Sequence, residues 1–237
     1  MAGSKVNLER RAEIGRERRA KTRTKLLTAA FELLGKEGGR SARIEEICQA
    51  ADVARGTFYN YFTSVDEMFR ALTFEISHAF NDATRAVIRR VPAGAVRSAF
   101  ALRYYLHKAR DDREWGWAMV NLSAGGPIFG EETYRYATES IQEGMATGQF
   151  HLPSQEIGRD VMMGGTLSAM ITILRADPGP DYPEAVIAQI LRGLGVNEAL
   201  IEKCVGPVLP DPFEFLASHG AAPESDTDGA LGLTEMK

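Results

Sequence analysis

The sequence predicts an all-α protein of about nine or ten helices, in which a small N-terminal head of three helices precedes a larger helical body. Apolar residues recur three and four positions apart along most of the chain, which is the spacing of a helix that buries one face. No stretch of useful length alternates apolar and polar residues as a half-buried strand does. Proline and paired glycines end the periodic stretches, as they do between helices joined by turns.

The composition is that of a soluble globular protein. The chain has 237 residues, 44% of them hydrophobic and 25% charged, which is enough for one large domain or two smaller ones. Its two cysteines, Cys48 and Cys204, offer neither a disulfide framework nor a metal-ligand pair, which is typical of a reducing cytoplasm. The uncharged run at residues 161–174 is shorter than the ~18 residues of a membrane span, and no signal-peptide core opens the chain. We therefore expect a cytoplasmic protein without membrane contact.

Residues 1–21 form a charged arm. Its side chains mix both signs with a basic excess: Arg10, Arg11, Arg16, Arg18, Arg19 and Lys21 among Glu9, Glu13 and Glu17. One interpretation is a solvated or frayed helix. The other is an arm that reaches along a DNA backbone or into the minor groove.

The first ordered helix is expected from about Thr22 to the glycine pair at 38–39. Its buried stripe is set by residues at i, i+3, i+4 and i+7, namely Leu27, Ala30, Phe31 and Leu34. This helix would brace the segment that follows.

Residues 43–62, RIEEICQAADVARGTFYNYF, predict two short helices joined by a tight turn. The first helix buries a stripe of Ile44, Ile47, Cys48 and Ala51. The turn falls at residues 51–53, where Asp52 tolerates a left-handed backbone.

The second of these helices has two different faces. Phe58 and Phe62 repeat at i, i+4 on the buried face, whereas Gly56 and Asn60 point outward with Thr57 and Tyr59 on the flanks. The outward face is small and polar, so it can approach base edges and phosphates closely. This is the helix-turn-helix arrangement that places its second helix in the DNA major groove.

Two stretches here carry a family resemblance. ICQAADVARGTFYNYFTSVDEMF resembles the signature of the tetracycline-repressor (TetR) family, and TRTKLLTAAFELLGKEGG is similar to that family's first helix. The resemblance is specific over residues 22–70 and architectural beyond. It implies a helix-turn-helix domain over 22–68, an effector-binding and dimerisation domain over 69–216, and a homodimer that binds a palindromic operator on double-stranded DNA.

Four residues depart from the family pattern. Ala54 stands where a hydroxyl residue usually caps the recognition helix, and an alanine there costs ~1 kcal/mol. Asp52 replaces the usual turn glycine, and Val65 stands where many members place a lysine toward a phosphate. Arg43 lies where a hydroxyl residue is common, and its guanidinium suits a phosphate contact.

The charge is divided along the chain. Residues 1–62 hold 13 Lys or Arg against 8 Asp or Glu, and the remainder holds 15 against 24, which gives the overall net charge of -4. A basic head on an acidic body fits DNA contact through the head alone. We expect the DNA-contacting residues to be Arg43, Arg55, Gly56, Thr57, Tyr59, Asn60 and Tyr61.

The body reads as a series of helices. An S-x-x-E capping box at 64–67 opens a helix to about Arg90, and further helices are expected at 113–124, 131–147, 154–176, 182–194 and 197–205. Residues 217–237 are short of large apolar side chains and predict a disordered tail.

Two sites are expected in the body. Aromatic and thioether side chains on adjacent helices are most simply core, but an effector cavity needs the same lining, which gives Tyr105, Trp115, Trp117 and Met119 as pocket candidates. The effector would then be small and largely apolar or aromatic. Small side chains on the uncharged helix and apolar residues on the next, which the resemblance places at a four-helix dimer interface, are Gly164, Gly165, Ala169, Ala185, Val186, Ile190 and Leu194.

Catalytic and cofactor motifs are missing from the sequence: it has no G-x-S-x-G, no G-x-G-x-x-G, no P-loop and no paired His or Cys spacing. The resemblance implies a ligand-responsive transcription regulator, more specifically a repressor, and with these motifs missing we expect no enzyme, cofactor or metal. The alternatives are a small all-helical enzyme or ligand carrier with an incidental helix-turn-helix, and a DNA-organising protein without a regulatory role.

Overall fold

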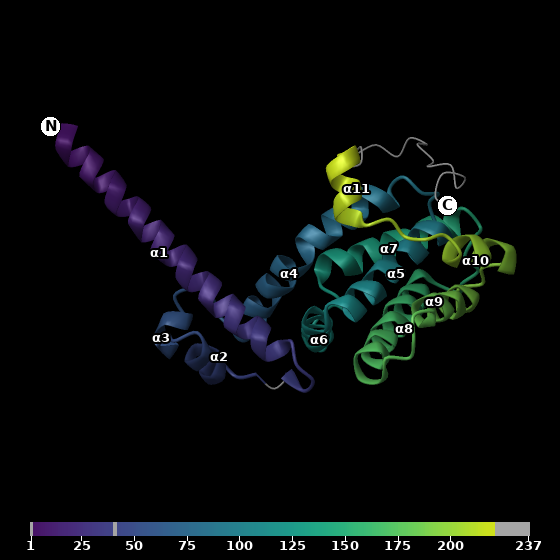
Figure 1. Ribbon diagram of the computed structural model, residues 1–237, viewed down its shortest axis with the longest axis horizontal. Helices are drawn as coiled ribbons and strands as arrows, with labels where there is room; N and C mark the ends of the chain where they lie inside the picture. Colours follow the sequence, from purple (N-terminus) through teal and green to yellow (C-terminus); the bar gives the residue numbers. More distant parts are fainter. Residues whose placement is uncertain (1, 40–41, 221–237) are drawn as a thin grey trace.

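The computed structural model describes residues 2–39 and 42–220, and in this part of the chain it contains eleven helices and no strand (Figure 1). The helices are α1 (Ala2–Leu34), α2 (Ile44–Ala50), α3 (Arg55–Phe58), α4 (Val65–Ile88), α5 (Ala95–Asp111), α6 (Arg113–Leu122), α7 (Glu131–Ala146), α8 (Gln155–Ala176), α9 (Tyr182–Gly193), α10 (Glu198–Val205) and α11 (Pro212–His219). The all-α prediction is confirmed, and the predicted body helices agree with α4 and α6–α10 to within about two residues.

The head is a small core closed by the second half of α1, α2 and α3. Fully buried residues from each of the three helices meet there, among them Leu26, Ile47 and Phe58. Met68 and Leu72, from the first turns of α4, complete the same core. The head therefore shares residues with the helix that leads into the body.

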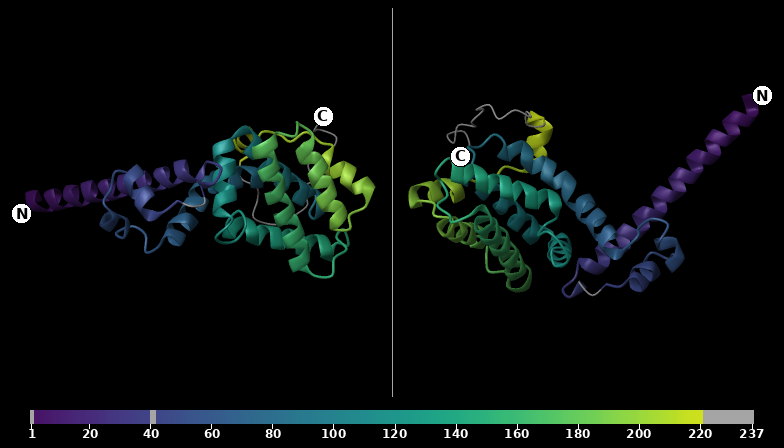
Figure 2. Two further views of the ribbon diagram at one scale, coloured as in Figure 1. Left: turned by 90° about the horizontal axis from the view of Figure 1, so that it is seen from below. Right: turned by 180° about the vertical axis from the view of Figure 1, so that it is seen from behind.

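The helix α1 begins at Ala2, twenty residues earlier than the predicted start at Thr22. Residues 2–34 contain no proline and are rich in alanine, arginine, glutamate, lysine and leucine, which are the strongest helix formers, so nothing interrupts the helix between arm and head. Every described side chain from Arg10 to Lys21 is exposed. The arm is a rod that projects away from the rest of the molecule in all three views (Figures 1 and 2).

The motif turn follows the prediction, and the second motif helix does not. Asp52 has φ 53°, the left-handed conformation expected there. The helix α3 ends at Phe58 and does not continue to Phe62, because the amides of Asn60 and Tyr61 donate to the carbonyls of Thr57 and Phe58 in a tighter i to i−3 pattern. Ala54 leaves the start of α3 without a side-chain cap.

The long helix α4 joins the head to the body (Figure 1). Ser64 Oγ accepts a hydrogen bond from the Glu67 amide at 3.1 Å, as the predicted capping box requires. The Glu67 carboxylate instead accepts from the Thr63 amide at 2.6 Å, one residue before the expected partner. Further along α4, Phe80 and Val87 lie in the body core. One rigid helix thus has its two ends in two different cores.

The body core is built around α5, which packs against α6, α7, α8, α9 and α10. An aromatic cluster occupies its centre, where Tyr105 lies 5.6 Å from Phe80, 5.5 Å from Trp115 and 5.1 Å from Phe129 between ring centroids. The helix α11 covers the far end of α4, where Arg90 donates to the carbonyl of His219 at 3.1 Å. Residues 217–219 therefore belong to a helix, contrary to the predicted tail, and 221–237 lie outside the described residues.

Candidate functional site

The recognition segment, residues 55–61, presents its polar side chains to solvent. Arg55, Gly56, Tyr59 and Asn60 are exposed, whereas Thr57 and Tyr61 are half-buried. Phe58 is fully buried and holds the segment on the head core, with the Tyr59 and Phe62 rings 5.4 and 5.7 Å from it. A side chain added at Gly56 would meet no atom within 4 Å, so the surface there is open to another molecule.

Arg55 is held by an acidic neighbour from the other helix of the motif. Its Nη1 atom lies 2.6 Å from Glu45 Oε1, and both side chains are more than half exposed. Hydrogen bonding with Tyr59 and the charge of Glu45 raise the pKa of Arg55 further above its ordinary value. The guanidinium therefore faces solvent beside a counter-charge that a phosphate would have to replace.

The arm and the recognition segment form one continuous surface. Arg19 donates to the carbonyl of Asn60 at 3.0 Å, and its guanidinium lies 5.4 Å from the centre of the Tyr61 ring. Between them is a shallow polar groove of about 480 Å³, lined on the arm side by Gly15, Arg18 and Thr22. Arg43, exposed at the start of α2, has its backbone amide bonded to Glu46 at 2.8 Å, which leaves its guanidinium outside the capping bond.

A cleft of about 680 Å³ lies between the start of α4, the loop that follows α6 and the first turn of α7. Phe69, Thr73 and Ser77 line it from α4, and Phe129 lines it from the loop. The cleft borders the head directly, because α6 ends at Leu122, a residue of the head core that also lines the cleft. It has the mixed apolar and polar lining of a small-molecule site.

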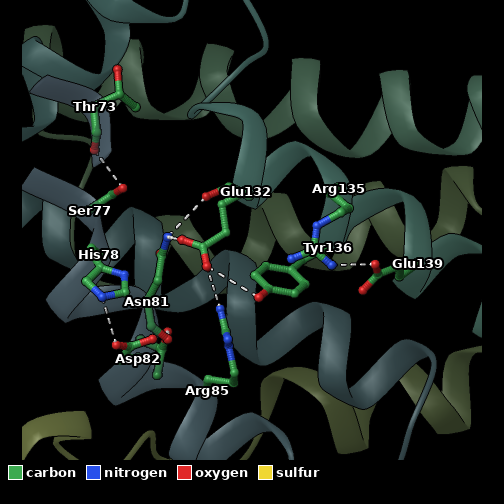
Figure 3. Close-up of polar contacts among 12 residues, drawn as sticks. Thr73, Ser77, His78, Asn81, Asp82, Arg85, Glu132, Arg135, Tyr136 and Glu139 are labelled. Carbon is green, nitrogen blue, oxygen red and sulfur yellow. Dashed lines mark hydrogen bonds and ion pairs between the residues drawn. The ribbon is translucent and has the colours of Figure 1, made fainter. Parts of the chain in front are cut away.

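A row of polar residues follows one face of α4 from the cleft toward the body core (Figure 3). Thr73, Ser77 and Asn81 are spaced four residues apart and are 8%, 4% and 7% exposed. Thr73 Oγ1 donates to the carbonyl of Phe69 at 2.8 Å, and Ser77 Oγ donates to the carbonyl of Thr73 at 2.7 Å. Because both hydroxyl hydrogens are used, these oxygens remain available as acceptors.

Glu132, at the start of α7, joins this row to the opposite wall (Figure 3). Its carboxylate accepts from Arg85 at 2.9 Å, from Tyr136 at 3.3 Å and from Asn81 at 3.4 Å. Burial alone would raise the pKa of Glu132, but the bonds from Arg85 and Asn81 outweigh it and hold that pKa below its usual range. Asn81 Oδ1 in turn accepts from the hydroxyl of Tyr105 at 2.8 Å, and burial raises the pKa of Tyr105 to about 12.

The four residues predicted for the pocket lie in the body core and do not line the cleft. Tyr105, Trp115, Trp117 and Met119 are all buried. Tyr105 lies directly behind Phe129 and is therefore one layer deeper than the cleft. Sequence reasoning missed Thr73, Ser77 and Phe129, although a glycine-rich loop at 125–130 and hydroxyl residues four apart were visible signals.

The residues predicted for the dimer interface separate into two groups. Gly164, Gly165, Ala185 and Val186 are exposed or half-buried on the outer face of α8 and α9, whereas Ala169, Ile190 and Leu194 are buried in the core of their own chain. The outer face also exposes Ile157 and Val161, and it contains a shallow hollow of about 410 Å³ between the two helices. Gly165 packs toward its own α9, since a side chain added there would lie 3.0 Å from Ile190 Cδ1.

Two further properties concern the whole described chain. Within residues 2–39 and 42–220, no three His, Cys, Asp or Glu side chains are grouped so that they could hold a metal ion. No helix in the same ranges is both long and apolar enough to cross a membrane.

A helix-turn-helix head with a basic arm, joined by one helix to a larger helical body, defines a DNA-binding transcription regulator. Family models agree with both parts: "Bacterial regulatory proteins, tetR family" matches residues 26–72, and "Tetracyclin repressor-like, C-terminal domain" matches residues 92–205. The chain belongs to the TetR family of bacterial regulators, whose members are in general transcription factors and not enzymes.

Individual relatives match different parts of the chain. The HTH-type transcriptional regulator UidR of Escherichia coli K12 is 33% identical over 54 residues, which is 23% of this chain and only 28% of UidR. RolR in complex with resorcinol has a similar structure, with a TM-score of 0.65 and 26% identity over 82% of this chain and 98% of RolR. FadR of Bacillus subtilis in complex with stearoyl-CoA, at 18% identity and a TM-score of 0.55 over 72% of this chain and 96% of FadR, shares the fold alone.

Proposed function

We propose that this protein is a cytoplasmic, ligand-responsive repressor that binds a palindromic operator as a homodimer and releases it when a small molecule occupies the body cleft. One observation carries the proposal. The first turns of α4 contribute Met68 and Leu72 to the head core, while Phe69 and Thr73 of the same turns line the cleft. A molecule in the cleft therefore touches the helix on which the head is built.

A second contact couples the cleft to the head. Asn121, buried near the end of α6, donates to the carbonyls of Leu34 and Lys36 at 2.7 and 2.9 Å. The bond to Leu34 satisfies a carbonyl group at the end of α1, where the helix itself offers no further amide, and the bond to Lys36 holds the turn that follows. A shift of α6, or of the loop that follows it, would therefore displace α1 as well as α4.

The homodimer is supported by the outer face of α8 and α9. Ile157 and Val161 are 47% and 40% exposed there, beside glycines that allow a helix of a second copy to approach closely. A dimer places two recognition segments on one face of the duplex, and the ligand would act by favouring one spacing of the two heads.

A small aromatic effector is supported by the lining of the cleft. Phe69, Phe74 and Phe129 offer rings, and the hydroxyl oxygens of Thr73 and Ser77 offer polar contacts. The ligand in the similar RolR structure is resorcinol, a dihydroxylated benzene. The effector class predicted from the sequence was small and largely apolar or aromatic. We therefore narrow it to monocyclic aromatic compounds.

The test is to recover operators from the protein's own genome. Genomic fragments retained by the purified protein are sequenced, and a palindromic consensus is then used in a binding assay against random DNA of the same length. Preference for the consensus that persists as salt rises supports the regulator, because contacts to phosphate alone weaken equally for both DNAs. Equal, salt-sensitive affinity for both would leave a DNA-organising protein, and no DNA retention would leave an enzyme or ligand carrier.

A further inference from the structure

Phe129 has a backbone conformation that is rare for a bulky residue. Its φ is 59°, in the left-handed region, and its ring is only 2% exposed. Its amide donates to Ser123 Oγ at 3.0 Å, which holds the residue in place. Strained residues of this kind persist where the surrounding structure fixes them, and they are frequent at ligand sites and switches.

The loop that carries Phe129 packs directly on α4. Gly130, the next residue, has φ 89°, and a side chain added to it would lie 2.6 Å from Thr73 Cγ2. Gly125 and Gly126, at the other end of the loop, have no atom within 4 Å of an added side chain. The loop therefore packs on α4 at Gly130, whereas at Gly125 and Gly126 there is open space beside the backbone, and glycines at both places allow the backbone to change conformation.

The ring of Phe129 separates two spaces. On one side it lines the cleft, and on the other it packs against Tyr105 at 5.1 Å. Behind Tyr105 lie Phe80 and Trp115, each within 5.6 Å of the Tyr105 ring. If the Phe129 ring swung out, the cleft would extend to an aromatic wall with room for one ring.

We infer that Phe129 is a plug that occupies the place of the effector's aromatic ring, and that the effector is a neutral monocyclic aromatic bearing hydroxyl groups. This inference rests on the proposed function only in taking the cleft as the effector site. The ligand's ring replaces the ring of Phe129 against Tyr105, and its hydroxyl groups meet the polar row of α4.

The polar row selects hydroxyl groups. The oxygens of Thr73 and Ser77 have already donated their hydrogens to backbone carbonyls, so they take hydrogen bonds from a ligand that donates. A phenolic O–H is such a donor, and a carboxylate is not.

The charges around the cleft disfavour an anion. Asp66, Glu131 and Glu132 line it together with the two cations Arg70 and Arg135. Arg135 is already bound to Glu139 at 2.7 Å. The pKa of the Glu67 carboxyl is held below its usual range by the hydrogen bonds from Thr63 and, in smaller part, by the charge of the nearby Arg70. With the Arg85–Glu132 and Arg135–Glu139 pairs each counted as neutral, Asp66 and Glu131 remain against Arg70. The lining of the cleft is then net negative, so a carboxylate ligand would meet repulsion, whereas a neutral phenol would not.

Displacement of the plug also gives the ligand a route to the head. The Gly130 backbone lies against Thr73, one turn along α4 from Phe69 and next to the head residue Leu72. When Phe129 leaves the core, this contact must change, and α4 loses part of the support on its cleft side. The ligand thus binds better to one arrangement of α4 than to the other, which a switch requires.

The experiment measures ligand binding without DNA. In a Trp117→Phe background, Trp115 is the sole tryptophan, and its quenching reports occupancy beside Tyr105. Phenol, cyclohexanol and benzoate serve as probes because they share their size and differ in aromaticity and charge. Each is titrated into the background protein and into three variants of it, Ser123→Ala, Phe129→Leu and Phe80→Leu, with circular dichroism as the check on folding.

Phenol is expected to bind at least about ten-fold more tightly than either other probe. Ser123→Ala loosens the plug without enlarging the space, and Phe129→Leu makes the plug smaller, so both should bind phenol about three- to ten-fold more tightly as the open form becomes more populated. Phe80→Leu removes the same volume on the far side of Tyr105 and should not tighten binding.

The plug is ruled out if the three probes bind alike or not at all, or if Phe129→Leu and Phe80→Leu change phenol affinity equally. Should Ser123→Ala fail to fold, the comparison of the two leucine variants decides alone. The proposed function is judged separately: phenol binding as expected, with operator DNA still retained at saturation, would sustain the plug and overturn the ligand response. Release of the operator by a different class of ligand would sustain the ligand response and overturn the plug.

Discussion

Glu45 and Arg55 form an ion pair across the two helices of the DNA-binding motif, with 2.6 Å between Oε1 and Nη1. The acid comes from the first turn of α2 and the base from the first turn of α3, so the pair spans the motif turn. Both side chains are solvent-exposed, which makes the pair easy to exchange for a contact with phosphate. While Arg55 stays paired with Glu45, its guanidinium cannot pair with a phosphate, so we predict that Glu45 suppresses a DNA contact of Arg55.

Glu45→Gln should therefore strengthen binding to all DNA sequences alike. The free guanidinium adds one phosphate contact, so the slope of log affinity against log salt should become steeper by about one. Binding measured over a salt series checks this. Glu46→Gln removes the same charge one residue away, where the carboxylate accepts from the Arg43 amide. An equal gain in both variants would mean that net charge acts, and not release of Arg55.

The arm should add affinity without sequence preference. Deleting residues 2–20 removes the exposed basic part of α1 while leaving the head core, which begins at Leu26. Affinity for operator and random DNA should fall together, and the salt slope should flatten by about one for each phosphate that the arm neutralises in the full-length protein. The single variant Arg19→Ala tests whether the hydrogen bond from Arg19 to the carbonyl of Asn60 positions the arm. An unchanged salt slope after the deletion would leave the arm as a solvated helix.

Operator recognition should depend on the polar side chains of the recognition segment. Asn60→Ala is expected to remove roughly 1 to 3 kcal/mol of operator binding if its amide reads a base edge. Thr57→Ala and Tyr59→Ala complete the set, and Ala variants of the arm arginines serve as the comparison because they should weaken random DNA equally. If all three variants keep the operator affinity with folding intact, recognition lies elsewhere.

The parts of the structure that follow from local sequence were predictable, and those made by distant segments were not. Asp52 at a positive φ and Ser64 at a helix N-terminus depend on a few neighbouring residues, so their residue types indicated the outcome. The cleft depends on the contact between Thr73 and Gly130, which lie far apart in the chain. Nothing in the type of either residue indicates that the two are in contact. The apolar residue types indicated that the aromatic cluster is buried. They did not indicate that Tyr105 lies behind Phe129.

The body also contains a buried ion pair whose loss should destabilise the fold. Glu184 on α9 accepts from Arg103 at 3.1 Å and contacts His107 Nε2 at 2.8 Å, and Arg103 also donates to the carbonyls of Cys204 and Pro207. Glu184→Gln would leave the buried charge of Arg103 uncompensated, so the free energy of unfolding should fall by about 3 kcal/mol. Urea unfolding near neutral pH measures this, with Glu198→Gln, at an exposed pair with Arg192, as the control expected to change little.

The same pair should make stability depend on pH in a defined direction. Burial alone would raise the pKa of Glu184, but the bond from His107 and the charge of Arg103 outweigh it and leave that pKa below the ordinary value. The folded form then holds its proton less tightly than the unfolded form, so the stabilisation is present above about pH 4.3, the usual glutamate pKa, and is lost as pH falls through the lowered value. The stability difference between wild type and Glu184→Gln should shrink over that acid range. A difference that stays constant would show that the carboxylate charge does not act.

The dimer interface can be tested at Val161 more cleanly than at the predicted position Gly165. Glutamate at Gly165 should place a buried, unpaired charge in the interface, but it would also collide with Ile190 of the same chain, so a loss of dimers there could reflect damage to the protomer. Val161 is 40% exposed on the outer face of α8. Val161→Glu should therefore leave the protomer folded and bury an unpaired charge only when two copies meet, at a cost of several kcal/mol.

Dimers of Val161→Glu should dissociate at micromolar concentration in analytical ultracentrifugation, with the helix content unchanged by circular dichroism. Val208→Glu makes the same substitution at a residue that is 76% exposed and belongs to neither α8 nor α9, and this variant should remain dimeric. Operator affinity should fall as the dimer dissociates, because a monomer has one head and cannot bind two half-sites about 34 to 36 Å apart at the same time. If a folded Val161→Glu protein stays dimeric, the interface lies on another face. The spacing of the two heads is then not set by the α8 and α9 surface.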